Sequence, residues 1–199
     1  DKGQLLHYVS LFFDITALKE QQEKLEHSAH FDALTDLPNR VLLMDRLHQC
    51  MLQAQRRGEP LALVFLDLDG FKAVNDQHGH AVGDALLQAL ALRMRAALRD
   101  GDTLARLGGD EFVAVLVDLP DTGASVPLLQ RLLHAASEPV QLGERQVQVS
   151  ASLGVTYYPQ PREVDVDMLL RQGDQAMYTA KVDGKNRFHV FAPPPATPA

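Results

Sequence analysis

Cysteine is almost absent from this chain of 199 residues, in which Cys50 is the single one. A lone cysteine excludes a disulfide within the chain and fits a reducing compartment. Cys50 falls on the apolar stripe of an expected helix, which favours a core-filling role over that of a nucleophile. The chain also lacks any apolar run near the ~20 residues that span a bilayer, and no secretory signal pattern opens it. We therefore expect a cytoplasmic location, and an anchor elsewhere in a full-length protein stays open.

Positive charge is the other shortage, because 19 Lys and Arg residues face 26 Asp and Glu residues, for a formal net charge of −7. This balance argues against a general nucleic-acid surface. An acidic protein still binds a polyphosphate when a divalent metal ion bridges the like charges. The length suits one domain with an appendage, and a core of that size folds alone.

Two glycines mark the most informative stretch, since Gly108 and Gly109 lie between apolar runs at 103–107 and 112–117. This pattern predicts a β-hairpin whose turn requires glycine geometry. The turn presents Asp110 and Glu111, and adjacent acids repel each other unless a cation neutralises them or water solvates both. Taken alone, a solvated acidic turn is the more common interpretation.

A second acidic site follows the apolar run 61–66, which predicts a central strand buried on both faces. The strand ends at Asp67, and Lys72 and Asn75 follow on a short helix near 71–75. If the strand neighbours the hairpin, Asp67 and Asp110 face each other.

The other expected elements alternate between helix and strand periodicity. Asn39 is a good N-cap and Gly58 a good terminator for the helix between them, and Asp165 is a cap for a later helix. The order predicts an α+β fold with a mostly antiparallel sheet of about five strands, flanked by helices. The expected helices are 40–57, 80–99, 126–136 and 165–181, and the later strands are 146–155 and 187–191.

Five short motifs in order resemble the GGDEF family, the diguanylate cyclases, over residues 31–191. They are DALTDLPNR at 32–40, DLDGFKAVND at 67–76, GHAVGD at 79–84, RLGGDEF at 106–112 and AKVDGKN at 180–186. The resemblance implies a catalytic domain at 31–192 with a fold related to the palm of nucleotide cyclases and polymerases. It also implies condensation of two GTP into cyclic di-GMP with release of two pyrophosphates, in a homodimer whose subunits each hold one GTP.

The same resemblance assigns the catalytic centre. Phosphoryl-type transfer rests on positioning and on charge neutralisation, which Mg²⁺ or Mn²⁺ held by carboxylates supplies. The implied metal site consists of Asp67, the Leu68 carbonyl and Asp110. Glu111 stands either at the metal or beside the attacking hydroxyl, and both roles stay open.

The implied phosphate contacts lie on the 67–76 and 180–186 motifs. Lys72, the backbone near Phe71, Lys181 and Lys185 correspond to the triphosphate site. The family usually has arginine where Lys185 stands, so we expect a weaker grip on phosphate, because lysine lacks the bidentate fork.

Asn75 and Asp84 correspond to the guanine site, where a carboxylate accepts from the base N–H groups. Alternatively, Asn75 is a helix C-cap and Asp84 an acid near a helix start. His78 and His80 form too weak a pattern for a metal site, and we favour structural or ribose-side roles for both.

Arg99 and Asp102 form an Arg-x-x-Asp motif that five residues separate from Gly108. At this offset the motif resembles the family's inhibitory site, which binds cyclic di-GMP. The alternative is an ordinary charged helix end.

The N-terminal segment resembles the last strand of a PAS domain (1–14) followed by a signalling helix (15–30). The positions Ile15, Leu18, Gln22, Leu25 and Ala29 have coiled-coil spacing, with Gln22 as a register-setting polar site. A single amphipathic helix lying on its own domain is the alternative. Residues 193–199 are rich in proline and alanine, and we expect a disordered tail or a cut linker.

Two rival functions remain beside the cyclase. One is a GTP- or cyclic-di-GMP-binding regulatory module that controls an adjoining phosphodiesterase domain or partner. The other is a purely structural dimerisation module, which leaves the intact acids unexplained.

Overall fold

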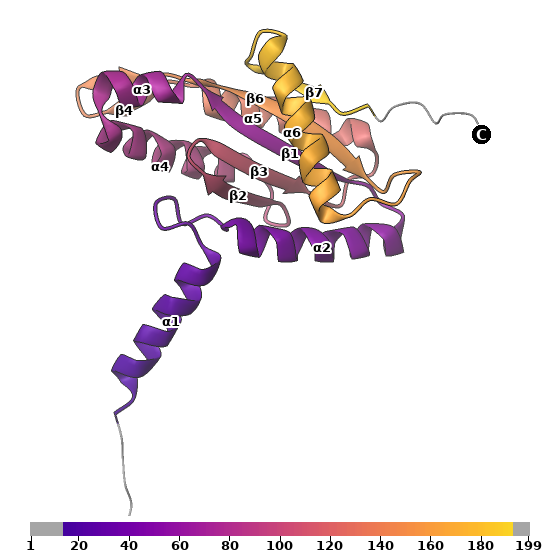
Figure 1. Ribbon diagram of the computed structural model, residues 1–199, viewed down its shortest axis with the longest axis horizontal. Helices are drawn as coiled ribbons and strands as arrows, with labels where there is room; N and C mark the ends of the chain where they lie inside the picture. Colours follow the sequence, from indigo (N-terminus) through magenta and orange to yellow (C-terminus); the bar gives the residue numbers. More distant parts are fainter. Residues whose placement is uncertain (1–13, 193–199) are drawn as a thin grey trace, which may run out of the picture.

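The computed structural model describes residues 14–192 and contains a five-stranded sheet with helices on both faces (Figure 1). The strand order is β2-β3-β1-β6-β7, and only the β6–β7 pair is parallel. The predicted α+β fold with a mostly antiparallel sheet is confirmed. The helices are α1 (Thr16–His30), α2 (Arg40–Arg57), α3 (Phe71–His78), α4 (His80–Ala96), the 3-10 turn η1 (Thr122–Ser125), α5 (Val126–Ser137) and α6 (Val166–Val182). The strands are β1 (Leu61–Asp69), β2 (Thr103–Gly108), β3 (Glu111–Leu116), β4 (Val140–Leu142), β5 (Arg145–Val147), β6 (Ser150–Tyr158) and β7 (Arg187–Val190).

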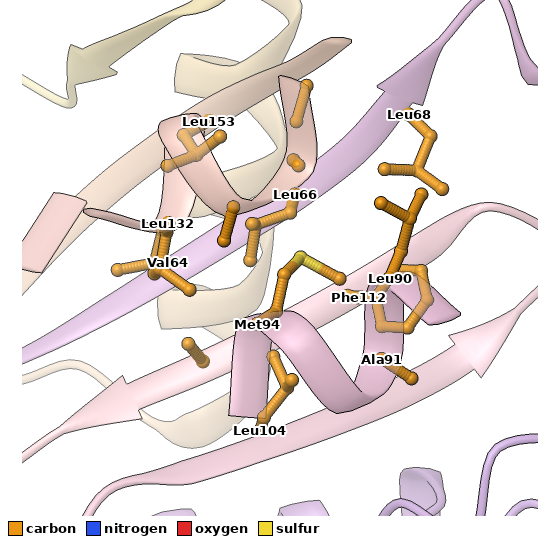
Figure 2. Close-up of a cluster of buried hydrophobic side chains, with 14 of the residues drawn as sticks. Val64, Leu66, Leu68, Leu90, Ala91, Met94, Leu104, Phe112, Leu132 and Leu153 are labelled. Atoms are coloured by element: carbon orange, nitrogen blue, oxygen red, sulfur yellow. The ribbon is translucent and has the colours of Figure 1, made fainter. Parts of the chain in front are cut away.

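Strand β1 lies in the middle of the sheet and is buried along almost its whole length. Alternate residues of a strand point to opposite faces, so β1 contributes to two separate cores. Val64 and Leu66 belong to the core that α4 and α5 cover, where Leu90, Met94 and Leu132 pack against the sheet (Figure 2). The opposite core, beneath α2 and α6, is formed by residues such as Leu43, Leu47, Leu63, Phe65 and Leu169.

The helix ends follow the predicted signals. The Asn39 side chain accepts hydrogen bonds from the Val41 and Leu42 backbone N–H groups at 2.9 and 3.2 Å, so it caps α2. Gly58 ends the same helix at φ +71°, in the left-handed region that favours glycine. Asp165 caps α6 by accepting from the Met168 N–H group at 2.7 Å.

The predicted strand 146–155 is wrong as one element, because the structure divides it into β5 and β6. Val147, Val149 and Ala151 are all buried on the expected side, so the alternation was interpreted correctly. The chain changes partner between them: β5 pairs with β4 in a separate hairpin, whereas β6 joins the main sheet beside β1. The predicted helix 80–99 also ends earlier, at Ala96.

Two glycines, Gly154 of β6 and Gly173 of α6, allow α6 to pack closely against the sheet. An added Cβ at Gly154 of β6 would overlap the Gly173 carbonyl oxygen and the Met177 backbone nitrogen of α6. Any side chain at Gly154 would therefore push α6 away from the sheet. This close contact fixes the height of α6, and thus of Lys181 near its end, above the strands.

Helix α1 points away from the sheet and joins the domain only near the start of α2 (Figure 1). Its end is tied down because the Asn39 side chain donates to the Ala29 carbonyl at 2.9 Å. The predicted strand within 1–14 and the predicted tail at 193–199 lie outside the described residues, apart from Asp14. Within the described part of the chain, no helix has both the length and the apolar character that a membrane span requires.

Candidate active site

The turn between β2 and β3 brings the predicted acids to the centre of the sheet. Gly108 has φ +144° and Gly109 has φ +53°. Both glycines therefore have the positive φ angles that the sequence predicted for this turn. β3 pairs with β1 so that Glu111 stands opposite Asp67. The Asp110 carbonyl accepts from the Leu68 N–H group at 3.3 Å. The acids of two motifs far apart in sequence therefore meet on neighbouring strands.

Lys181 supplies a cation to this group of acids from α6. Its ammonium nitrogen lies 2.8 Å from the Asp67 carboxylate. Burial raises the pKa of Asp67, the hydrogen bond from Lys181 opposes that effect, and the charge of Asp110 raises the pKa further. Burial is also the largest cause of the raised pKa of Glu111, followed by the charges of Asp67 and Asp174. The site thus holds carboxylates close enough to repel one another, which favours binding of an added cation.

No group of three or more His, Cys, Asp or Glu side chains arranged to hold a metal ion occurs among residues 14–192. Magnesium is commonly held by one or two carboxylates together with phosphate oxygens of the substrate, rather than by an all-protein cage. Asp67 and Asp110, which repel each other, and the adjacent Leu68 carbonyl offer a donor set of that kind. The residues present therefore fit a magnesium ion that binds together with a nucleotide.

Arg106, to which the sequence assigned no role, braces the turn between β2 and β3. Its Nε and one terminal nitrogen donate to the Gly109 carbonyl at 3.0 and 2.8 Å. Its other terminal nitrogen donates to Asp32 at 2.8 Å. Asp32 also accepts from the backbone and hydroxyl groups of Thr35. The turn is thus fastened to the segment between α1 and α2 by a side chain that is only 9% exposed.

Asp69 is a second residue whose role the sequence did not reveal. Its carboxylate accepts from the Ser150 and Ser152 hydroxyls, both at 2.8 Å, and from the Asn186 N–H group at 3.3 Å. Lys185 and Asn186 have φ +62° and +47°, a conformation that side chains other than glycine seldom adopt. Asp69 therefore holds the turn that carries Lys185 next to the end of β1.

Lys72 lies on the first turn of α3, which begins directly after β1. Gly70 precedes the helix at φ +85° and has no side chain to cap it. The first N–H groups of α3, at Phe71 and Lys72, are thus left for another acceptor, and helix N-termini favour anions. The Lys72 side chain is exposed, as is that of Lys185.

The predicted guanine residues lie close together where α3 meets α4. The Asn75 side chain packs against Gly83, and an added Cβ at Gly83 would overlap its amide oxygen. Asp84 is the next residue of α4 and is exposed, as is His80 on the first turn of that helix. His78 ends α3 and is half-buried. Asn75 and Asp84 therefore lie close together where the junction of α3 and α4 reaches the surface.

The Arg-x-x-Asp motif lies away from these acids, and its two members differ. Asp102 is only 3% exposed and accepts from the Arg99 and Val117 N–H groups at 3.0 and 3.1 Å. It therefore fastens the turn before β2 to the end of β3. Arg99 is exposed and borders a hollow of about 520 Å³ that Arg131 and His134 also line.

Cys50 is half-buried against the core beneath α2, and burial raises the pKa of its thiol. A raised thiol pKa keeps the side chain protonated and unreactive. This environment agrees with the core-filling role expected from the sequence.

Comparison with known proteins identifies the family. The model of the GGDEF domain of diguanylate cyclases matches residues 29–187. The chain is 43% identical over 176 residues to the bifunctional diguanylate cyclase/cyclic di-GMP phosphodiesterase MucR of Pseudomonas aeruginosa, covering 88% of this chain and 25% of MucR. It is 38% identical over 178 residues to the cyclic di-GMP phosphodiesterase NbdA of the same organism, covering 89% of this chain and 22% of NbdA.

A solved structure agrees with this assignment. The GGDEF domain of TpbB from Pseudomonas aeruginosa superimposes with a TM-score of 0.77 at 36% identity, covering 82% of this chain and 95% of that domain. The chain belongs to the GGDEF diguanylate cyclase family. It spans about a quarter of the length of the curated relatives MucR and NbdA.

Proposed function

We propose that this chain is a magnesium-dependent diguanylate cyclase that joins two GTP molecules into cyclic di-GMP and releases two pyrophosphates. The observation that carries the proposal is the meeting of Asp67 with Glu111 across β1 and β3, with the Lys181 ammonium 2.8 Å from Asp67. Carboxylates that repel one another beside a cation suit a bound metal–triphosphate complex.

Different groups of residues bind the phosphates, the base and the metal ion of the substrate complex. The first N–H groups of α3, Lys72, Lys181 and Lys185 hold the β- and γ-phosphates, and Asp69 positions the turn that carries Lys185. Asn75 and Asp84 bind the guanine edge, with His80 on the ribose side. Asp67, the Leu68 carbonyl and Asp110 would hold Mg²⁺ or Mn²⁺, whose charge neutralises the phosphate oxygens.

The reaction is a displacement at the α-phosphorus. The 3′-oxygen of a second GTP forms a bond to this phosphorus, and the bond to the α,β-bridging oxygen breaks. The electron pair of the broken bond leaves with pyrophosphate, and the hydroxyl proton passes to the Glu111 carboxylate. Glu111 suits this role because it stands opposite Asp67 on the neighbouring strand and directly follows Asp110, beside the residues that would hold the metal. Repeating the step on the second GTP closes the ring.

The reaction needs two domains face to face, because each holds one GTP. Helix α1 supports a homodimer, since it points away from the domain and exposes Ile15 and Leu25 of the predicted seam. A parallel coiled coil of two such helices buries these residues. We further propose that cyclic di-GMP inhibits the enzyme at the hollow beside Arg99.

The test is a purified chain incubated with GTP and Mg²⁺, with the products separated by chromatography. We expect cyclic di-GMP and pyrophosphate in a ratio of one to two, and no product when Mg²⁺ is removed by a chelator. GTP binding without turnover in a confirmed dimer would refute the proposal.

A regulatory module is the second candidate, because the relative NbdA bears the name of a phosphodiesterase alone. In that case GTP or cyclic di-GMP binds here and controls an adjoining domain or partner. Binding of GTP without product in the same experiment supports this candidate.

A further inference from the structure

A hollow of about 430 Å³ opens beside the β2–β3 turn. No part of the GTP molecule assigned to this domain above occupies it. Phe65 and Leu170, both buried, contribute apolar surface to its lining. The polar lining includes Glu111 from the turn and Asp174 from α6. The hollow thus shares Glu111 with the candidate active site.

Its location is fixed by the direction of β1 and α6. Phe65 precedes Asp67 on β1 by two residues and points to the same face, whereas Lys72 follows Asp67 on α3. On α6, Asp174 precedes Lys181 by two turns, or roughly 10 Å at 1.5 Å per residue. Asp67 therefore stands between this hollow and the lysines proposed to hold the β- and γ-phosphates.

Displacement at phosphorus places the attacking and leaving oxygens roughly in line. The leaving pyrophosphate lies toward Lys72 and Lys185, so the attacking 3′-oxygen must approach the α-phosphorus from the opposite side. The hollow beside Glu111 lies on that side.

Two arginines give the hollow its donors. Arg40, from the first turn of α2, and Arg171, from α6, both line it. Neither forms an ion pair with any other residue of the described range 14–192. Their guanidinium groups are therefore available to ribose oxygens and phosphates, while Glu111 and Asp174 offer acceptors for ribose hydroxyls.

We propose that this hollow is the acceptor subsite, which receives the ribose of the second GTP as the partner subunit presents it. Arg171 and Arg40 donate to this incoming nucleotide, and Asp174 accepts from its 2′-hydroxyl, so the 3′-oxygen is held beside Glu111. The inference rests on the proposed cyclase function and names residues that act on the nucleotide of the other subunit.

The test compares turnover with binding of the domain's own nucleotide. Arg171→Ala should lower kcat about ten- to hundredfold, because it removes a charged donor to the nucleotide that the partner subunit presents. It leaves the contacts to the domain's own nucleotide unchanged. The affinity of the dilute monomer for 3′-deoxyguanosine triphosphate, which lacks the nucleophile, should stay within about twofold of wild type. Arg171→Lys should recover part of the rate, since it keeps the charge.

Arg145→Ala, at an exposed arginine on the β4–β5 hairpin, is the matched control and should turn over like wild type. Sedimentation and a thermal melt establish that each variant is folded and equally dimeric. An Arg171→Ala rate equal to that of the control would overturn the subsite, as would a parallel loss of 3′-deoxyguanosine triphosphate affinity. A wild-type dimer without product overturns the cyclase proposal itself, which separates the two failures.

Discussion

Replacing Arg106 by methionine should destabilise the domain far more than replacing an arginine in a surface ion pair. Arg106 is 9% exposed and its partner Asp32 is 22% exposed. The change removes three hydrogen bonds, two to the Gly109 carbonyl and one to Asp32. Asp32 keeps only its bonds from Thr35, so part of a shielded charge is left without its counter-charge.

The expected cost follows from how well the pair is shielded. Removing one partner of a fully buried pair costs about 3–5 kcal/mol, whereas exposed pairs contribute about 0–1 kcal/mol. Asp32 retains some contact with water and two hydrogen bonds, so we expect about 2–3 kcal/mol. For a chain of this size that corresponds to a lowering of Tm by about 4–12 °C.

The assay is urea unfolding followed by circular dichroism, with Arg57→Met as the control. Arg57 pairs with Asp118 at the same distance of 2.8 Å, but these side chains are 57% and 65% exposed. We expect a loss of less than about 1 kcal/mol for the control. The double variant with Asp32→Asn should cost less than the sum of the single changes, because neither charge is then left alone. Equal losses for Arg106→Met and Arg57→Met would show that the pair is too well solvated for this reasoning.

Four further predictions concern the site and its surroundings. Asp67→Asn or Asp110→Asn should abolish cyclic di-GMP synthesis while the thermal melt stays near wild type, and wild-type-like turnover would contradict the metal assignment. Asp84→Ser should weaken the preference for GTP over ATP, measured as the ratio of kcat/KM values, whereas an unchanged ratio places the guanine contact elsewhere. Arg99→Ala should keep turnover but raise the cyclic di-GMP concentration needed for half inhibition about thirtyfold, and superimposable inhibition curves would exclude this residue. The pKa of Asp32 is lowered, because burial, which raises it, is outweighed by the hydrogen bonds that Asp32 accepts. The ionised Asp32 therefore stabilises the fold fully above its ordinary pKa of about 3.9, and this contribution is lost as the pH falls through the folded-state value. The loss of unfolding free energy caused by Asp32→Asn, measured in urea, should accordingly shrink below about pH 4.

The local elements of this fold were predictable because their signals are local. The cap at Asn39, the stop at Gly58 and the glycines of the β2–β3 turn each depend on a few neighbouring residues. Burial of 61–66 on both faces followed from an unbroken apolar run. The acids at Asp67 and Asp110 were found because each ends or opens such a run.

The remaining contacts were not predictable because they join residues far apart in sequence. Arg106 and Asp32 are 74 residues apart, and nothing in either motif specifies the other as its partner. Asp69 meets Ser150 and Ser152 only because β6 pairs with β1. The division of 146–155 was missed for a related reason, since alternation predicts which face a residue occupies but not which strand pairs with it.

The glycine contact between α6 and β6 has a consequence for how this domain changes during evolution. Burial raises the pKa of both Asp67 and Glu111, which means that their charged forms destabilise the fold. We therefore expect their replacement by neutral residues to leave the fold intact. Gly154 has no such freedom, since even alanine would separate α6 from the sheet. If the proposed catalysis were no longer under selection, we would thus expect the acids to be lost early and Gly154 to be kept much longer. Such a protein would keep the fold and the nucleotide-binding surface without the acids, and could then be selected as a sensor.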